Sequence, residues 1–152
     1  MDARATDRVI TTGETLSKIV HISREEIVAF AQMSHDENPL HTDSQAARRG
    51  RFGEIIASGQ HTVAILMGML ATYFSRHDDG VRREMLCLNM NFSFKGPVFA
   101  EHDVTLQWKV SNVEWNCKLR GLVAHLDGSA TTAEGKLAVV GRGTILVRES
   151  GA

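Results

Sequence analysis

The chain has 152 residues, of which 43% are hydrophobic and 23% are charged, and its formal net charge is −1 at pH 7. This is the size and composition of one globular domain that buries a core of its own. A nearly neutral chain lacks the overall basic field that draws proteins to nucleic acid or to an anionic membrane, so we expect neither as a partner.

The sequence also lacks the marks of secretion and of membrane insertion. The N-terminal segment MDARATDRVITTGETL contains no apolar run of the kind found in signal peptides. The longest apolar run, residues 62–74, is too short to cross a bilayer. The two cysteines, Cys87 and Cys117, have neither metal-site spacing nor the number needed for a disulfide framework. We therefore predict a cytoplasmic protein with free thiols.

No repeat, low-complexity block or flexible linker divides the chain, so we expect a single domain over residues 1–152 with frayed ends at 1–9 and 149–152. Its first helix is predicted to follow the capping-box pattern Ser23-Arg24-Glu25-Glu26 and to end near Ser34. The Asn-Pro step at 38–39 disfavours helix beyond that point. A short second helix is predicted through Arg49, with Asp43 or Ser44 as its N-cap and Gly50 ending it.

The segment from Ser58 to Phe74 predicts a central buried helix. Ser58 is a suitable N-cap, which places Gly59 in or beside the first turn. From Val63 onward the side chains are apolar or small on every face, and such a helix must be enclosed by other elements.

After Gly80 the hydrophobic pattern changes to the two-residue period of strands. The apolar residues that alternate with polar or small ones are Leu86, Leu88, Met90, Phe92 and Phe94. Further strand-like runs cover residues 104–110, 118–125 and 135–147, with Asp127-Gly128 read as turn material between them. Strands that follow helices predict an α+β fold in which an antiparallel sheet curves around the buried helix.

The most unusual stretch is HDENPLHTD, residues 35–43, which gathers titratable side chains around an Asn-Pro step. Its polar and turn-forming residues are His35, Asp36, Asn38, Pro39, His41 and Asp43. A metal site is not expected, because their spacing matches no zinc or iron pattern. A nucleophile is not expected either, since the chain has no G-x-S-x-G elbow and neither cysteine lies beside a histidine.

Asp36 and His41 have both a structural and a chemical interpretation. Asp36 could hydrogen-bond the backbone in the turn before Pro39, and His41 could be an imidazole satisfied by a neighbour. Together, an aspartate and a histidine on a loop kinked at Pro39 can also converge on one water molecule. Such a pair is a general acid–base device.

The order and spacing of these residues resemble those of a known family. The matching segments are Asp36-x-Asn38-Pro39-Leu40-His41-x-Asp43, Ala46-Ala47, Phe52-Gly53, Ile56-Ala57-x-Gly59 and Phe92-Ser93-Phe94-Lys95-x-Pro97-Val98. The series is similar to the MaoC-like (R)-specific enoyl-CoA hydratases over about residues 22–108. The C-terminal third of the chain matches only as generic strands.

The resemblance implies the hot-dog fold, an antiparallel sheet wrapped around one long helix and usually paired into a homodimer or a higher homo-oligomer. It also implies interconversion of trans-2-enoyl and (R)-3-hydroxyacyl thioesters, with coenzyme A favoured over acyl carrier protein. No cofactor is expected, because the thioester of coenzyme A or acyl carrier protein is part of the substrate. Asp36 and His41 correspond to the catalytic pair. The Gly59 N–H, at the positive end of the buried helix, would stabilise the thioester oxyanion, and glycine there would permit close approach of the substrate.

Four further residues are candidate substrate contacts: Asn38, Ser58, His61 and Met67. Asn38 is also suited to fixing the loop, His61 is either a packed histidine or a pocket wall, and Met67 is either core or acyl-pocket lining. A separate basic cluster could meet the phosphates of coenzyme A or stay solvated; it comprises Arg48, Arg49 and Arg51.

The chain departs from the family pattern at three places. His35 stands where relatives usually have glycine, Ser58 replaces a histidine often found before the oxyanion glycine, and residues 65–69 lack a serine that some hydratases carry on the central helix. Two other functions are compatible with the fold. One is a non-catalytic acyl-thioester binding or partner subunit, and the other is a hot-dog thioesterase.

Overall fold

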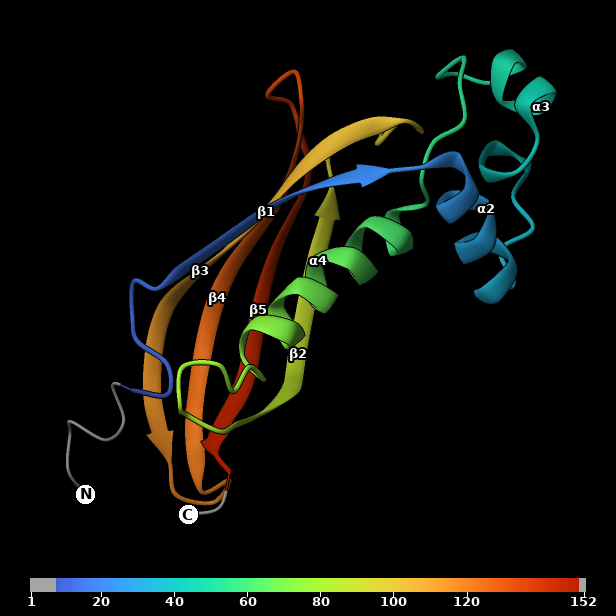
Figure 1. Cartoon of the computed structure of the whole chain (residues 1–152). Helices are drawn as coiled ribbons and strands as arrows, with labels where there is room; N and C mark the ends of the chain where they lie inside the picture. Colours follow the sequence, from blue (N-terminus) through green and yellow to red (C-terminus); the bar gives the residue numbers. More distant parts are fainter. Residues whose placement is uncertain (1–7, 151–152) are drawn as a thin grey trace.

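The computed structural model describes residues 8–150, which fold around one central helix, α4 (Figure 1). In chain order the elements are β1 Thr15–Ile22, α2 Arg24–Met33, the 3-10 helix η1 Pro39–His41, α3 Ser44–Arg49, α4 Gly59–Tyr73, β2 Arg83–Phe94, β3 His102–Asn116, β4 Gly121–Thr132 and β5 Leu137–Glu149. In this part of the chain the five strands form one antiparallel sheet in the order β1-β3-β4-β5-β2. The predicted α+β class is confirmed.

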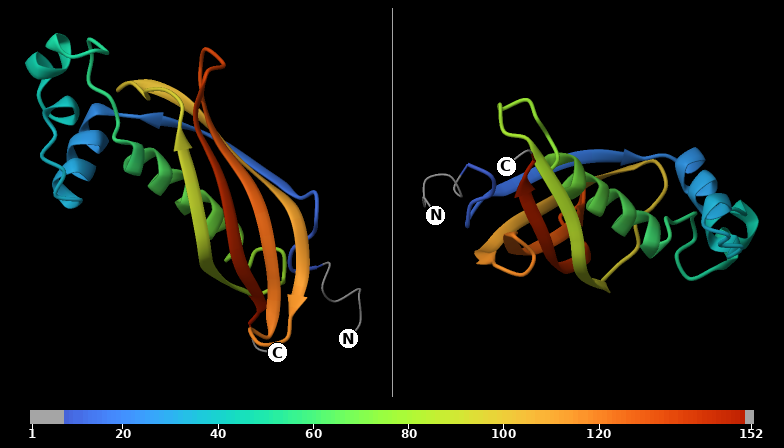
Figure 2. Two further views of the ribbon diagram at one scale, coloured as in Figure 1. Left: turned by 180° about the vertical axis from the view of Figure 1, so that it is seen from behind. Right: turned by 90° about the horizontal axis from the view of Figure 1, so that it is seen from below.

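The sheet curves around α4, while α2, η1 and α3 gather beyond the end at which α4 begins (Figure 2). The local signals for these helices act as expected. The Ser23 hydroxyl accepts from the Glu26 N–H, and the Glu26 carboxylate accepts from the Ser23 N–H, which completes the capping box of α2. Asp43 caps α3, and Gly50 ends it. The short helices therefore carry residues 34–43 to the N-terminal end of α4.

Helix α4 begins at the Ser58 N-cap and is buried against the sheet. Leu66, Leu70 and Phe74 have no exposed surface. A stripe along the other side, Ala64, Gly68 and Ala71, remains exposed. The expectation that the whole helix is enclosed thus holds only for the side that faces the sheet, because one sheet curves over only one side of a helix.

The sheet accommodates a large indole beneath α4 by means of glycine. Trp108 on β3 lies opposite Gly128 on β4, and a Cβ atom at Gly128 would lie 2.5 Å from the Trp108 ring. The Trp108 indole is fully buried, and its Nε1–H donates a hydrogen bond to the Leu66 carbonyl of α4 at 2.9 Å. The prediction of a turn at Asp127-Gly128 is therefore wrong. Both residues lie inside β4, where glycine provides space for the ring.

A second aromatic ring approaches the same place from the other side. Gly128 pairs with Gly141 on β5, and Gly141 pairs with Phe92 on β2. A Cβ atom at Gly141 would lie 2.5 Å from the Phe92 ring. The Phe92 and Trp108 rings meet edge to face with their centroids 6.3 Å apart. Two glycines side by side thus let two aromatic rings converge under the helix.

The edge strand β2 departs from the expected alternation. A bulge between Cys87 and Asn89 shifts the register by one residue, which exchanges the two faces of the strand. Met90 and Phe92 are half-buried against the core, but Leu86 lies on the opposite face and is 56% exposed. The sequence carries no clear strand signal for the other edge strand, β1, because its apolar residues do not alternate with polar ones, and most of its side chains are exposed.

The first described residues are packed into the fold. Val9 and Ile10 are buried, and the buried Arg83 guanidinium donates to the Val9 carbonyl and to both oxygens of Asp79. This guanidinium holds the pKa of the Asp79 carboxyl well below its usual range. Of the predicted frayed ends, residues 1–7 and 151–152 lie outside the described residues. Among residues 8–150, no helix is long and apolar enough to cross a membrane.

Candidate active site

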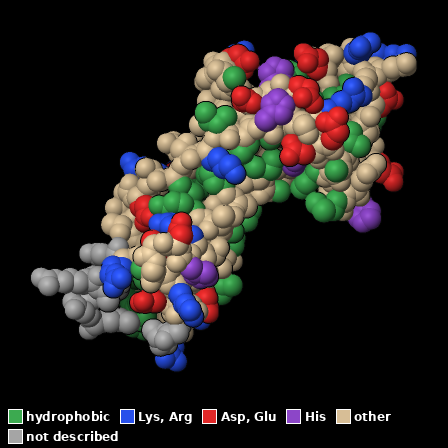
Figure 3. Space-filling model, in the orientation of Figure 1, with side chains coloured by type: hydrophobic (Ala, Val, Ile, Leu, Met, Phe, Trp, Pro, Cys, Tyr) green, Lys and Arg blue, Asp and Glu red, His purple; other side chains and the backbone are tan. Residues whose placement is uncertain are grey.

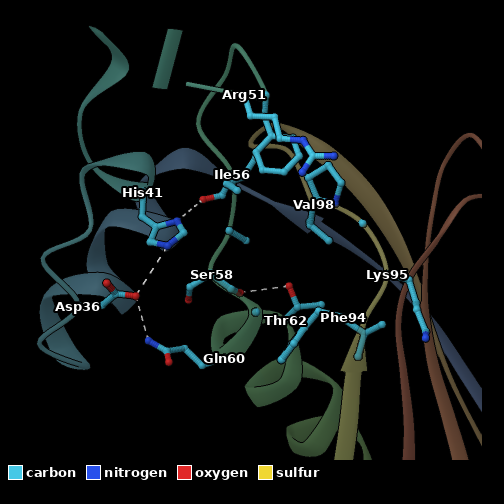
Figure 4. Close-up of a pocket in the computed structure, with 16 residues that line it drawn as sticks. Asp36, His41, Arg51, Ile56, Ser58, Gln60, Thr62, Phe94, Lys95 and Val98 are labelled. Atoms are coloured by element: carbon cyan, nitrogen blue, oxygen red, sulfur yellow. Dashed lines mark hydrogen bonds and ion pairs between the residues drawn. The ribbon is translucent and has the colours of Figure 1, made fainter. Parts of the chain in front are cut away.

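A pocket of about 650 Å³ lies where residues 36–41, the start of α4 and the end of β2 meet (Figure 4). Its lining brings together Asp36, His41, Ser58 and Gly59, four of the residues singled out in the sequence. They arrive from two directions, since Asp36 and His41 follow α2, whereas Ser58 and Gly59 open α4.

Asp36 directly follows the turn that ends α2. Its Oδ1 atom accepts from the Asn38 N–H at 3.1 Å, which is the bond expected for an aspartate in a turn before proline. Its Oδ2 atom accepts from the Gln60 side-chain amide at 3.0 Å and also faces His41. One oxygen of the Asp36 carboxylate therefore makes the contact expected of a turn residue, whereas the other faces His41.

His41 is buried in η1, and its ring is held by a backbone carbonyl. The Nδ1 atom lies 2.7 Å from the Ile56 carbonyl oxygen. A carbonyl only accepts hydrogen bonds, so Nδ1 bears the hydrogen, and in the neutral ring Nε2 keeps a lone pair. Nε2 lies 3.7 Å from Asp36 Oδ2. This distance exceeds a direct hydrogen bond and suits a water molecule that donates to both atoms.

Asn38 fixes the loop that separates these two groups. Its side-chain oxygen accepts from the Leu40 N–H at 3.1 Å and so caps η1. Pro39 occupies the first position of this short helix, where its fixed φ angle is favourable. Asn38 does not line the pocket.

The start of α4 presents free backbone donors to the pocket. The first N–H groups of a helix have no partner within the helix and form its positive end. In α4 the Ser58 hydroxyl accepts from one of them, the His61 N–H. A Cβ atom at Gly59 would lie 2.5 Å from the Phe94 ring. A side chain at this position would thus displace the Phe94 ring from its place beside Gly59. Gly59 was expected to leave open space for the substrate, but the space where its side chain would lie is occupied by the Phe94 ring.

Besides Asn38, two more of the four predicted substrate contacts, His61 and Met67, are not among the pocket-lining residues. The His61 ring is buried and stacks on Phe30 of α2 with 4.6 Å between the centroids, so it is the packed histidine of the two alternatives. Burial lowers the pKa of His61, which keeps the ring neutral at pH 7. Met67 is half-buried farther along α4.

Several pocket residues were not identified from the sequence. Gln60 follows Gly59 on α4, and Phe94 and Lys95 close the β2 side of the pocket. Phe94 and Lys95 lie within the matching segment of residues 92–98, but no sequence signal assigns them to the pocket, and Gln60 adjoins the motif that ends at Gly59. Of the basic cluster, Arg51 lines the pocket, whereas Arg48 and Arg49 are exposed on α3. Among the described residues, no group of three or more His, Cys, Asp or Glu side chains could hold a metal ion.

Comparison with known proteins identifies the family. The MaoC like domain matches residues 7–128, so the chain belongs to the MaoC-like family, whose relatives include hydratases and dehydratases. The antiparallel sheet around one central helix is the hot-dog fold, as expected.

Three relatives indicate the range of similarity. The (R)-specific enoyl-CoA hydratase of Aeromonas caviae is 28% identical over 120 residues, which cover 79% of this chain and 82% of that protein. A solved (R)-hydratase structure from A. caviae, described as involved in PHA biosynthesis, aligns with a TM-score of 0.78 and 26% identity over 90% of this chain and 96% of that one. The mitochondrial 3-hydroxyacyl-[acyl-carrier-protein] dehydratase of Arabidopsis thaliana is 27% identical over 100 residues, 66% of this chain. The match spans only 55% of that longer protein.

One residue of the loop has a backbone conformation that favours another amino acid. His35 follows the last residues of α2 with φ of 55°, and its side chain is exposed. A left-handed residue after a helix is most often glycine, because a Cβ atom costs about 1–2 kcal/mol there. The backbone conformation at position 35 therefore favours glycine, and His35 is not among the pocket-lining residues.

We expect His35→Gly to stabilise the fold by about 0.5–1 kcal/mol, because relief of the left-handed strain exceeds the added chain entropy of glycine. Thermal unfolding followed by circular dichroism should show a rise in Tm of about 1–4 °C. His77→Gly is the matched control, since His77 is exposed but does not have a positive φ. It should not raise Tm, and an equal rise in both variants would contradict the strain argument.

Proposed function

We propose that this chain is a hydro-lyase that interconverts trans-2-enoyl thioesters and (R)-3-hydroxyacyl thioesters. One observation carries the proposal: the Asp36 carboxylate and the Nε2 atom of His41 face each other across 3.7 Å in the pocket that also contains the start of α4. Two proton acceptors and a set of backbone donors are what the addition of water to a conjugated thioester requires.

The chemistry follows from these positions. A water between Asp36 and His41 attacks C3 of the enoyl group while one of its O–H bonds breaks and the proton passes to Asp36. The π electron pair of the C2–C3 bond moves towards the thioester, whose oxygen becomes negative. The Gly59 N–H and the positive end of α4 stabilise this oxygen. The Asp36–His41 pair then returns the proton to C2 on the same face, which adds one water and restores both side chains.

Asp36→Asn should lower kcat for hydration by about 10² to 10⁴, because it keeps the shape of the side chain but removes the base. His41→Ala should have an effect of the same order, because it removes the group that orients the water. The double variant should lose far less than the product of the single losses, since both residues act on one water. The measurement is the loss of absorbance of a conjugated enoyl-CoA, with circular dichroism to verify folding.

His35→Gly is the control within the same loop, and its activity should stay within about tenfold of wild type, roughly 1.4 kcal/mol of barrier. If Asp36→Asn kept near-wild-type hydration while His35→Gly abolished it, the roles proposed for Asp36 and His41 would be wrong.

We infer further that coenzyme A is the favoured carrier. Arg51 and Lys95 both line the pocket and come from different segments, one before α4 and one after β2. The Arg51 guanidinium lies 5.7 Å from the centroid of the Phe52 ring, a cation–π contact that steadies it. Two cations on the pocket lining are suited to the phosphates of coenzyme A.

The double variant Arg51→Ala/Lys95→Ala should raise KM for an enoyl-CoA by about three- to tenfold, the range expected for exposed charge pairs, and salt should reduce the difference. The same enoyl group on N-acetylcysteamine carries no phosphate, so its hydration should be unchanged. Lys109→Ala, on an exposed position of β3, is the control. Equal losses with both thioesters would mean that the cations do not recognise the carrier.

We also propose that the chain forms a homodimer through β2. This strand lies at an edge of the sheet, and Leu86 and Leu88 on it are 56% and 44% exposed. Hydrophobic side chains reach the surface in the central part of the molecule, where α4 lies (Figure 3). A second copy paired along β2 would satisfy the free backbone groups of the edge and cover these side chains.

Leu88→Lys should convert the dimer into a monomer at micromolar concentration, because it places a charge in the proposed contact. Ile19→Lys is the matched control, since Ile19 is 67% exposed on the opposite edge strand, β1. Sedimentation velocity distinguishes the two states. A fully active wild-type monomer at micromolar concentration, or dissociation by Ile19→Lys alone, would contradict pairing through β2.

A further inference from the structure

Gln60 makes a contact that neither the sequence motifs nor the proposed chemistry includes. Its side-chain Nε2 atom lies 3.0 Å from Oδ2 of Asp36, and this is the same oxygen that faces His41. The backbone of Gln60 belongs to the first turn of α4, next to Gly59. The close-up in Figure 4 shows the amide reaching from the helix across to the loop that carries Asp36.

The contact determines which part of the carboxylate is available to water. A carboxylate oxygen has two lone-pair directions, and the Gln60 amide occupies one of those on Oδ2. The Asn38 N–H holds Oδ1. Both oxygens therefore have a donor that restrains rotation of the carboxylate. The second lone pair of Oδ2 is left for a water that also contacts Nε2 of His41.

The contact also joins the two halves of the pocket. Asp36 lies on a loop, whereas Gln60 lies on the helix that is fixed to the sheet through Leu66 and Trp108. Within the described residues, the Gln60 amide makes the one side-chain hydrogen bond from α4 to Asp36. One side chain thus sets the base at a defined place relative to the Gly59 N–H, which begins the same helical turn.

We propose that Gln60 is a positioning residue: it orients the Asp36 carboxylate towards the attacking water and fixes the base relative to the backbone donor at Gly59. This inference rests on the proposed hydration chemistry of Asp36. Gln60 itself transfers no proton, because its amide is neutral and remains so throughout.

The test is steady-state kinetics of a short trans-2-enoyl-CoA with Gln60→Met, which keeps an unbranched side chain of similar length but removes the amide donor. We expect kcat to fall by about ten- to a hundredfold, the loss typical of one hydrogen bond to a charged group, while KM stays within about twofold. Gln60→Glu, which places a second carboxylate beside Asp36, should lose at least as much. Gln32→Met, at an exposed position of α2, is the control and should match wild type.

A double-mutant cycle separates positioning from other roles. In the Asp36→Asn background Gln60→Met should cost no more than about twofold, because no base remains to be oriented. An equal loss in both backgrounds, or a raised KM with unchanged kcat, would overturn the inference. If kcat were unchanged in Gln60→Met but fell strongly in Asp36→Asn, the role of Gln60 would be overturned and the proposed function would stand. Absence of hydration by the wild-type protein would overturn the proposed function and the role of Gln60 with it.

Discussion

Helix α4 is held on the concave face of the sheet by the buried indole of Trp108, whose N–H donates to the Leu66 carbonyl in the middle of the helix. The ring fits only because Gly128 on the neighbouring strand has no side chain. A glycine inside a strand weakens it, and here the burial of a large aromatic ring offsets that cost. This contact holds the middle of α4 against β3, and the first turn of the helix, which carries Gly59 and Gln60, extends from that anchored segment.

The candidate site forms where this fixed helix meets a loop whose shape is set by separate contacts. The buried bond from His41 Nδ1 to the Ile56 carbonyl ties the loop to the chain segment that leads into α4, and it leaves Nε2 as the free acceptor. The stack of His61 on Phe30 packs α4 against α2, which directly precedes Asp36. The proposed acid–base groups thus come from the loop, and the proposed backbone donors come from the helix. Each half is restrained by groups that take no part in the proposed chemistry.

Much of this arrangement could be predicted from the sequence, because the signals are local. The capping box at Ser23, the N-cap at Ser58 and the Asn-Pro step are read over three or four residues, and they fix where helices begin and end. The loop motif was also sufficient to bring Asp36 and His41 together, because both lie between the same two helices. The α+β class followed from the change in hydrophobic period.

The remaining features depend on contacts between residues far apart in the chain. Gly128 resembled a turn residue because nothing nearby in the sequence shows that a tryptophan from another strand occupies its space. The bulge in β2 changes which leucines face outward, and it follows from pairing with β5. Gln60 reaches the site through its contact with Asp36, and Phe94 through its packing against Gly59, so the sequence around each residue does not show that it belongs to the site.

The central claim is that this pocket adds water across a conjugated double bond and leaves the thioester intact. A thioesterase of the same fold would act on the same class of substrate and release the carrier thiol. The most direct measurement is to incubate the wild-type protein with a trans-2-enoyl-CoA and to follow absorbance of the conjugated thioester and free thiol in the same sample. We predict loss of absorbance, no thiol release and accumulation of the (R)-3-hydroxyacyl-CoA. Release of thiol in proportion to substrate consumed, with no hydroxyacyl product, would contradict this account.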